Sequence, residues 1–236
     1  MNITFSSTWL RLDERMFLHE VDAFRDYIFK SEKSIKEIQT EFEKFWEKEV
    51  ADNPDGADDL HFHYEEEINK TFKLIPHIAF SSLYISISSL YESSIKKACQ
   101  SLSHLPLDLK WKDMAGNSDF EKVRAFLSKV VLVDLNPLNQ PWAKVMSYYK
   151  LRNRMVHHGS KIEVNDNKKI EDNSLSALFT QYNSSLSLEG WGDFLVTDSQ
   201  ILFDYLEVIK EFITGLYKIL QERSELLNKT KNDITL

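Results

Sequence analysis

Apolar side chains recur at steps of three and four residues over most of the chain, which places them on one face of an α-helix. The first such run extends from Phe17 to Val50 and ends at the turn-forming sequence ADNPDGADD, residues 51–59. A second run extends from about residue 59 to residue 104. Pro76 lies within it and is expected to kink or divide the helix, because proline has no backbone N–H group.

The second half of the chain contains shorter patterns. Ser118, followed three residues later by Glu121, has the spacing of a capping box and predicts a helix that continues to about residue 133. A further helix is expected from near Pro141 to Gly159, because glycine accepts positive φ just past a helix end. Residues 160–185 are polar and predict a mobile excursion. Residues 186–197 predict a hairpin about Gly190. A closing helix is predicted to begin at Asp198 or Ser199 and to end in a polar tail at about 228–236.

Together these patterns predict an all-α fold, a single helical bundle over residues 1–236 with a small β-hairpin before the last helix. The chain has 236 residues, of which 42% are hydrophobic and 12% aromatic, so it can form a substantial core. Its six glycines and five prolines are few, which favours long helices. The single cysteine, Cys99, allows no internal disulfide and fits a reducing compartment.

Charge and hydropathy narrow the class of protein. The formal net charge is -8, which argues against a protein that coats nucleic acid non-specifically. No stretch approaches 18 uncharged apolar residues, so we expect a cytoplasmic protein without a membrane partner.

One basic segment departs from this acidic background. Residues 141–162 contain five Lys or Arg residues and two histidines but no Asp or Glu. Arg152 falls in the middle of an apolar face of the predicted helix, and a partly buried guanidinium needs an anionic partner or a cleft. Glu92 is the one acidic residue between Ile68 and Leu107, so we predict that its carboxylate faces Arg152. Glu92 could be a plain ion-pair partner or take a direct part in chemistry.

Asn153 and His157 are four residues apart and are therefore neighbours on a helix. The Asn153 amide is expected to hydrogen-bond one imidazole nitrogen and leave the other directed at a substrate, which is how a general base has its tautomer fixed. His157 also lies in the last helical turn, where the carbonyl end of the helix favours a protonated imidazole.

The sequence Arg152-Asn-Arg-Met-Val-His157 resembles the R-x4-6-H motif of the HEPN superfamily (higher eukaryote and prokaryote nucleotide-binding domains). The resemblance implies a metal-independent, cofactor-free endoribonuclease that forms a homodimer with the two motifs at a shared cleft. Such proteins are often toxins or antiviral defence effectors with an antitoxin or defence-system partner. By this analogy His157 would transfer protons, Arg152 would stabilise the transition state and Asn153 would position both.

Two histidines match the spacing of the motif, and the residues that follow them differ from those of one toxin branch. His158 also satisfies the variable spacing and is ranked second, because only His157 lies four residues from Asn153. In one toxin branch the histidine is followed by x-Tyr and that tyrosine is modified. Here His158 and Gly159 follow His157, so regulation of that kind is not expected.

Several alternatives stay open. The cations could complement the helix dipole, and Lys150, Arg154 and Lys161 could bind RNA phosphates or form a solvated face. The aromatic side chains Trp142, Tyr148 and Tyr149 could stack on bases or fill the core. The second function we consider is a non-catalytic helical scaffold that binds a nucleotide or a protein partner. We expect no metal site at His61 and His63, because side chains two residues apart diverge on a helix.

Overall fold

The computed structural model describes the backbone of residues 4–102, 109–167 and 169–234, with side chains other than those at 4–7, 55, 57, 58 and 227–234. Within these ranges the chain is helical except for loops and one antiparallel hairpin, so the predicted fold class is confirmed. The main elements are α1 (Thr4–Asp52), α2 (Ala57–Asn69), α3 (Ile75–Ser101), α4 (Asp119–Lys129), α5 (Asn139–His157), α6 (Asn173–Gln181), β1 (Leu186–Glu189), β2 (Asp193–Val196) and α7 (Gln200–Ile234). Short 3-10 turns lie at Pro54–Gly56, Trp111–Asp113 and Asn136–Leu138.

The chain divides into two compact units that alternate along the sequence. Unit 1 contains Met1–Ala23, Ser88–Met146 and Leu206–Leu236, and unit 2 contains Phe24–Ile87 and Ser147–Tyr205. The helices α1, α3, α5 and α7 each contribute residues to both units. The single domain expected for residues 1–236 stays a prediction.

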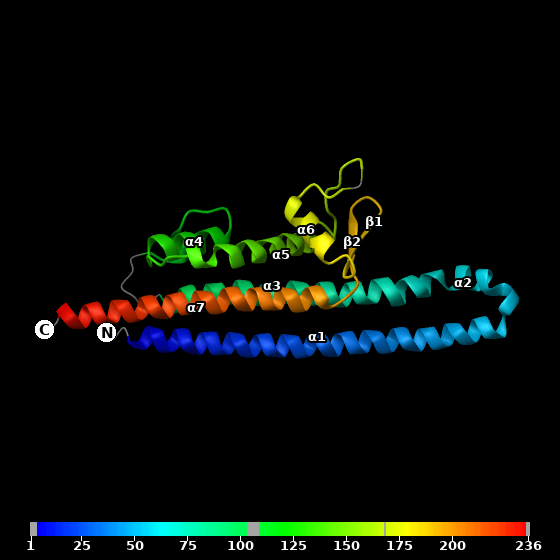
Figure 1. Ribbon diagram of the computed structural model, residues 1–236, viewed down its shortest axis with the longest axis horizontal. Helices are drawn as coiled ribbons and strands as arrows, with labels where there is room; N and C mark the ends of the chain where they lie inside the picture. Colours follow the sequence, from blue (N-terminus) through cyan, green and yellow to red (C-terminus); the bar gives the residue numbers. More distant parts are fainter. Residues whose placement is uncertain (1–3, 103–108, 168, 235–236) are drawn as a thin grey trace. The chain divides into compact units, whose positions relative to one another are not determined.

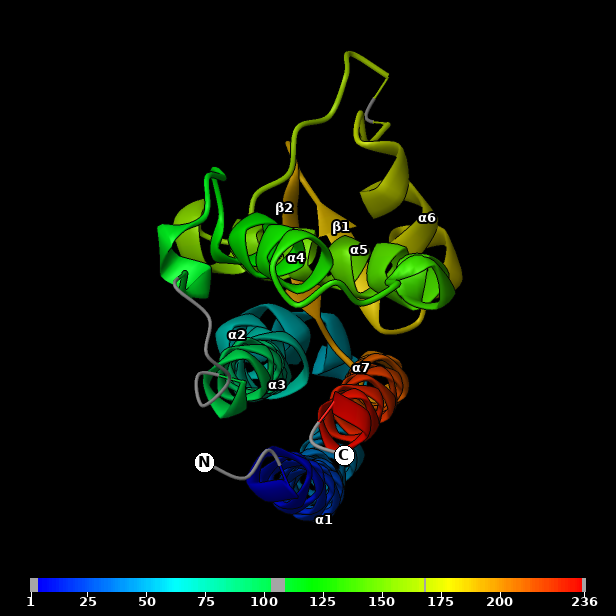
Figure 2. The same cartoon turned by 90° about the vertical axis from the view of Figure 1, so that its left-hand side faces the viewer.

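Unit 1 is a layered arrangement of helices. Its parts of α1, α3 and α7 lie beside one another, and α4 and the start of α5 cover α3 and α7 on the side away from α1 (Figure 2). Aromatic contacts join the layers, because Tyr91 of α3 stacks on Phe120 of α4 and Trp142 of α5 meets Phe212 of α7 edge to face. The aliphatic core of this unit is completely or almost completely buried and includes Leu10, Val21, Ile95, Val123, Val145, Leu206, Ile209 and Ile213.

Unit 2 begins with a helical hairpin of α1 and α2 (Figure 1). Edge-to-face ring contacts hold its two arms together, with ring centroids 5.9 Å apart for Phe42 and Phe72 and 5.4 Å apart for Phe45 and Tyr64. The rest of the unit contains the start of α3, the end of α5, α6, the β1–β2 hairpin and the start of α7. Its buried side chains include Ile28, Tyr84, Ile87, Leu151, Leu178, Phe194, Val196 and Tyr205.

The second long helix changes to a π-helical turn just before Pro76, where the sequence predicted a kink or a division. Lys70–Leu74 form a π-helical turn between α2 and α3, and the Ile75 N–H group donates to the carbonyl of Lys70. Proline cannot donate a helical hydrogen bond and its ring displaces the preceding carbonyl, so a local widening of the helix accommodates it. By length and composition the stretch Asp59–Ser101 could cross a membrane, a criterion that buried core helices of soluble proteins also meet.

Helix ends largely follow the predicted caps. The Ser118 hydroxyl accepts the Glu121 N–H at the start of α4, whereas the Glu121 carboxylate accepts from Asn117 and not from Ser118. At the start of α7 the Asp198 carboxylate accepts the Gln200 N–H.

Two predicted segments differ in the structure. The expected excursion at 160–185 contains the helix α6, whose N-cap is Asp172, and a bridge between Val164 and Ile170. Helix α7 extends through Ile234, so the expected tail at 228–236 has a helical backbone as far as it is described.

Candidate functional site

The candidate site lies at the C-terminal end of α5. The helix ends at His157, and Gly159 follows with a φ of +58°, which confirms the predicted role of this glycine. The Arg154 carbonyl accepts hydrogen bonds from the N–H groups of His158, at 3.2 Å, and Ser160, at 3.1 Å. These bonds satisfy a carbonyl that the helix itself leaves without a donor.

Arg152 is half-buried on α5 and is held by two neighbours. Its guanidinium carbon lies 5.4 Å from the centroid of the Tyr149 ring, which is within the range of a cation–π interaction. Its Nη1 donates a hydrogen bond of 3.1 Å to Oδ1 of Asn153. Two residues of its own helix therefore help to hold the guanidinium.

The Asn153 amide takes a different partner from the one predicted. Within the described residues no hydrogen bond joins Asn153 to His157, and the amide oxygen accepts from Arg152. A charged guanidinium is a stronger donor than a neutral imidazole, so Arg152 competes successfully for this oxygen. Asn153 positions the arginine rather than the histidine.

His157 and His158 are both exposed to solvent. An exposed imidazole at a helix end can accept a proton from a bound molecule and return it to another atom. Both side chains are accessible for such a reaction, so the choice between them stays open.

The three flanking cations, predicted to bind RNA, each lie close to a carboxylate that follows later in the chain. The paired atoms are Lys150 Nζ and Asp172 Oδ2 at 2.9 Å, Arg154 Nη1 and Glu163 Oε1 at 3.1 Å, and Lys161 Nζ and Asp193 Oδ1 at 3.5 Å. The acid-free segment at 141–162 is thus compensated in space by carboxylates from residues 163–193. The RNA-binding role of the three cations stays a prediction.

The carboxylate of Asp172 is held in place opposite Lys150 by the start of α6. It is the N-cap of α6, and its Oδ1 accepts the backbone N–H groups of Ser174, at 2.8 Å, and Leu175, at 3.2 Å. The Ser174 hydroxyl also donates to this carboxylate, and with the Lys150 ammonium it holds the pKa of Asp172 well below its usual range. Asp172 therefore stays ionised opposite Lys150 throughout the neutral range.

A tyrosine cluster supports α5 beneath the site. The ring of Tyr148 stacks parallel to that of Tyr205, with centroids 4.7 Å apart, and the Tyr84 hydroxyl donates to the Tyr148 carbonyl. The Tyr148 hydroxyl bonds that of Tyr182, which donates to Asp204 at 2.8 Å. Burial raises the pKa of Tyr148, so this hydroxyl stays protonated.

The aromatic residues considered for base stacking have other partners. Tyr148 is buried, Tyr149 lies beneath Arg152, and Trp142 packs against Phe120 and Phe212 in unit 1. Glu92 is a half-buried residue of α3 in unit 1, whereas Arg152 belongs to unit 2, and their predicted pairing stays a prediction.

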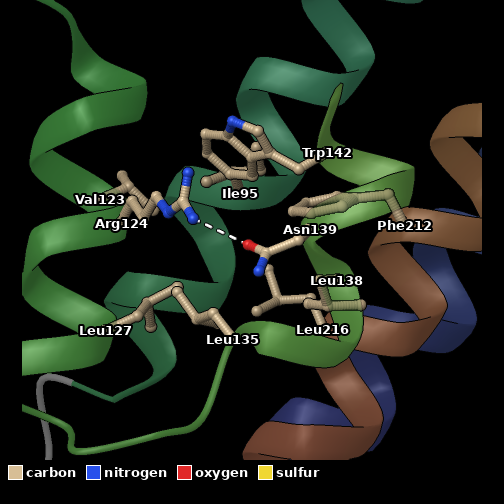
Figure 3. A pocket seen from close by; sticks show the side chains of 10 residues that line it. All are labelled: Ile95, Val123, Arg124, Leu127, Leu135, Leu138, Asn139, Trp142, Phe212 and Leu216. Atoms are coloured by element: carbon tan, nitrogen blue, oxygen red, sulfur yellow. Dashed lines mark hydrogen bonds between the residues drawn. The ribbon is translucent and has the colours of Figure 1, made fainter. Parts of the chain in front are cut away.

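Described residues of unit 1 line two cavities, and the larger has a volume of about 330 Å³ and is lined by Cys99, Gln100, Leu109, Lys110, Trp111, Lys112 and Phe126. The described residues contain no group of three or more His, Cys, Asp or Glu side chains that could hold a metal ion. The smaller cavity has a volume of about 10 Å³, which is about what one water molecule needs. Its lining is mainly apolar, and Arg124 at its edge donates to Asn139 at 2.8 Å and lies 5.5 Å from the Trp142 ring (Figure 3).

The sequence reasoning missed the acidic partners of the basic segment. Asp172 carried a usable signal, because an aspartate followed by Leu175, Leu178 and Tyr182 has the pattern of a capped amphipathic helix. Glu163 and Asp193 carried none, since their pairing depends on how the chain folds back. Comparison with models of protein families, with curated proteins and with solved structures found no match.

Proposed function

We propose that the chain is an endoribonuclease of HEPN type that cleaves RNA between two copies of itself, without a metal or another cofactor. The proposal is supported by one observation at the C-terminal end of α5. The guanidinium of Arg152 contacts Tyr149 and Asn153 there, and His157 is exposed at the same helix end. Phosphodiester transesterification needs positive charge at the phosphate and a group that transfers protons, and one helix end supplies both kinds of side chain.

In this mechanism an imidazole takes the proton of the ribose 2′-hydroxyl, and the 2′-oxygen attacks the adjacent phosphorus. The bond from phosphorus to the 5′-oxygen breaks, and an imidazolium returns a proton to that oxygen. The products are a 2′,3′-cyclic phosphate and a 5′-hydroxyl. Arg152 stabilises the negative charge on the phosphoryl oxygens, and in a homodimer the histidines of the two copies act as base and acid.

Substitution of the histidines tests the mechanism. We expect His157→Ala to lower the cleavage rate by about 10²- to 10⁴-fold, the usual contribution of a positioned acid–base group. His158→Ala is the comparison variant, because this neighbour is also exposed to solvent, and its effect should be small if His157 transfers the proton. Both variants should keep the thermal midpoint of the parent, since neither imidazole is buried. Cleavage of mixed RNA in EDTA, with detection of cyclic-phosphate ends, is the measurement.

A wild-type protein that leaves RNA intact, or full activity in both histidine variants, would contradict the proposal. Loss of wild-type cleavage on adding EDTA would contradict its metal independence. If only His158→Ala abolishes cleavage, the second histidine is the acting one.

The proposed biological role is that of a cytoplasmic toxin or antiviral defence effector restrained by an antitoxin or defence-system partner. Expression of the wild-type chain should then slow the growth of a host that lacks the restraining partner. The His157→Ala variant should remove this toxicity at an equal level of protein.

A non-catalytic scaffold is the second candidate, and the carboxylates paired with Lys150, Arg154 and Lys161 favour it. Such pairing lowers the positive potential that draws RNA to a nuclease. A scaffold would bind a nucleotide or protein partner and release no RNA fragments under any condition, whereas the nuclease produces them.

A further inference from the structure

The larger cavity of unit 1 has the size of a small-molecule site. Its volume of about 330 Å³ lies at the lower end of the range of roughly 300–1,000 Å³ that is usual for ligand pockets in proteins. The C-terminal end of α3 and the 3-10 turn Trp111–Asp113 contribute to its lining, and Phe126 of α4 forms a further wall. All these elements belong to unit 1, so the cavity is formed within one compact unit.

The deeper part of the lining is apolar and uncharged. Cys99 and Phe126 are each 2% exposed and Trp111 is 8% exposed, whereas Leu109 is 49% exposed and borders solvent. Burial raises the pKa of the Cys99 thiol to about 12, so the thiol is neutral near pH 7 and does not repel an anion. An apolar group that enters this part of the cavity is removed from water, which favours its binding.

Lysine side chains supply the charge of the cavity. Lys110 and Lys112 are exposed cations, and none of the described lining residues is acidic. The Lys112 ammonium lies 5.6 Å from the centroid of the Trp111 ring, a cation–π contact that holds positive charge beside an apolar wall. The Lys96 ammonium lies 5.9 Å from the same ring and pairs with Asp119 at 2.7 Å. Lys110 and Lys112 form no ion pair of this kind within the described residues.

We propose that this cavity binds a small organic anion that has an aromatic or aliphatic body and a carboxylate or sulfonate head. The body lies against Trp111, Phe126 and Leu109, and the head meets the ammonium groups of Lys110 and Lys112. A mostly apolar pocket with a few charged groups binds through the first and orients its ligand through the second. The inference is independent of the proposed nuclease, because no residue of the motif in unit 2 takes part.

The probe is the dye anilinonaphthalene sulfonate, an aromatic anion whose fluorescence rises in apolar surroundings. Titration of the full chain should show one saturable site. Phenylnaphthylamine has the same rings without the sulfonate and should bind more weakly, because it lacks the partner of the two ammonium groups. Lys110→Gln and Lys112→Gln should each weaken binding of the sulfonate about 2- to 5-fold, the usual contribution of a partly exposed ion pair, and leave binding of the neutral amine unchanged.

Lys129→Gln is the matched control. Lys129 is an exposed residue at the end of α4 in the same unit, and it does not line the cavity. Its substitution changes the net charge by the same amount and should leave the affinity for both dyes unchanged. Leu109→Asp places a negative charge on the lining at a half-exposed position, so it should weaken binding of the sulfonate more than binding of the amine. All four variants should keep the thermal midpoint of the parent.

A parent protein that binds neither dye, or that binds the neutral amine as tightly as the sulfonate, would overturn the inference. Equal losses in Lys112→Gln and Lys129→Gln would also overturn it, because net charge rather than the cavity would then attract the dye. Losses confined to Lys110→Gln, Lys112→Gln and Leu109→Asp would support it. None of these measurements involves RNA, so their outcome leaves the proposed nuclease unaffected.

Discussion

Arg152 keeps a full positive charge although its side chain is half-buried, because a guanidinium cannot release its proton near neutral pH. Tyr149 and Asn153 compensate part of the lost hydration through the ring face and the amide oxygen. This arrangement uses the Asn153 oxygen that a histidine would otherwise employ. In the proposed mechanism the imidazole of His157 is therefore oriented only when RNA or the second copy is bound.

His77, which also belongs to unit 2, has well-defined hydrogen-bond partners. Nδ1 of His77, near the start of α3, accepts the Val196 N–H at the end of β2 at 3.1 Å, and the Ser81 hydroxyl also contacts it at 3.2 Å. An imidazole nitrogen can accept this N–H only while it carries no proton. Burial lowers the pKa of the His77 imidazole below its usual value. The hairpin is thus attached to α3 through a neutral imidazole.

We predict that His77 makes the free energy of unfolding depend on pH. Above about pH 6.5 the imidazole is neutral in both states, and the full stabilisation is present. As the pH falls below this value the unfolded chain binds the proton first, so stability decreases until the folded pKa is passed. In His77→Gln the amide oxygen can still accept the Val196 N–H, and the pH dependence should flatten. Urea unfolding between about pH 5 and pH 8 compares the two proteins, and equal slopes would refute the prediction.

In the β1–β2 hairpin, Gly192 allows the close contact between β2 and residues 160–162. The register of β1 and β2 runs from Leu186 opposite Val196 to Glu189 opposite Asp193. Residues 160–162 add a third, short segment beside β2 through the carbonyl of Gly192. A side chain at position 192 would collide with this segment.

We predict that Gly192→Ala destabilises the protein by about 1–3 kcal/mol more than Gly190→Ala, because only the first adds overpacking. Both positions have positive φ, which costs alanine about 1–2 kcal/mol at either site. No atom outside the turn lies within 4 Å of a Cβ atom at position 190. Thermal or urea unfolding of the two variants gives the difference, and equal losses would mean that the Ile162 contact adjusts freely.

The whole molecule has a net charge of -8, so acidic side chains outnumber basic ones and carboxylates are available to pair with the cations. The cations on the motif helix and after it are not presented as an unbroken basic surface, since Lys150, Arg154 and Lys161 each face a carboxylate. A nuclease built in this way attracts RNA weakly at long range and depends on a few close contacts.

We therefore predict a shallow salt dependence of RNA binding by the His157→Ala protein. With one or two phosphate contacts the logarithm of the association constant should fall with a slope of about -1 against the logarithm of the salt concentration. A slope of about -3 would show that the three paired cations also contact phosphates. Asp172→Asn keeps an N-cap for α6 but removes the charge opposite Lys150, so it should steepen the slope by about 0.7. An unchanged slope would show that Lys150 does not reach the RNA.

Local residue patterns predict the helices, an irregularity at Pro76, the cap at Ser118, the helix end at Gly159 and the hairpin about Gly190. These features depend on residues a few positions apart, because apolar periodicity, capping and turn conformation act within one or two helical turns. The helix α6 had the same kind of local signal, but it was obscured by the polar composition of residues 160–185.

The partners of the charged and aromatic side chains follow from the way the chain folds back on itself. The carboxylates that neutralise Lys150 and Lys161 lie more than twenty residues later in the chain, and the exposure of Trp191 depends on how the hairpin packs. The chain pairs side chains across such separations only after it has folded back on itself, so no local pattern reports them. Helix content is therefore readable from residue spacing, whereas the electrostatics of a site follow from packing.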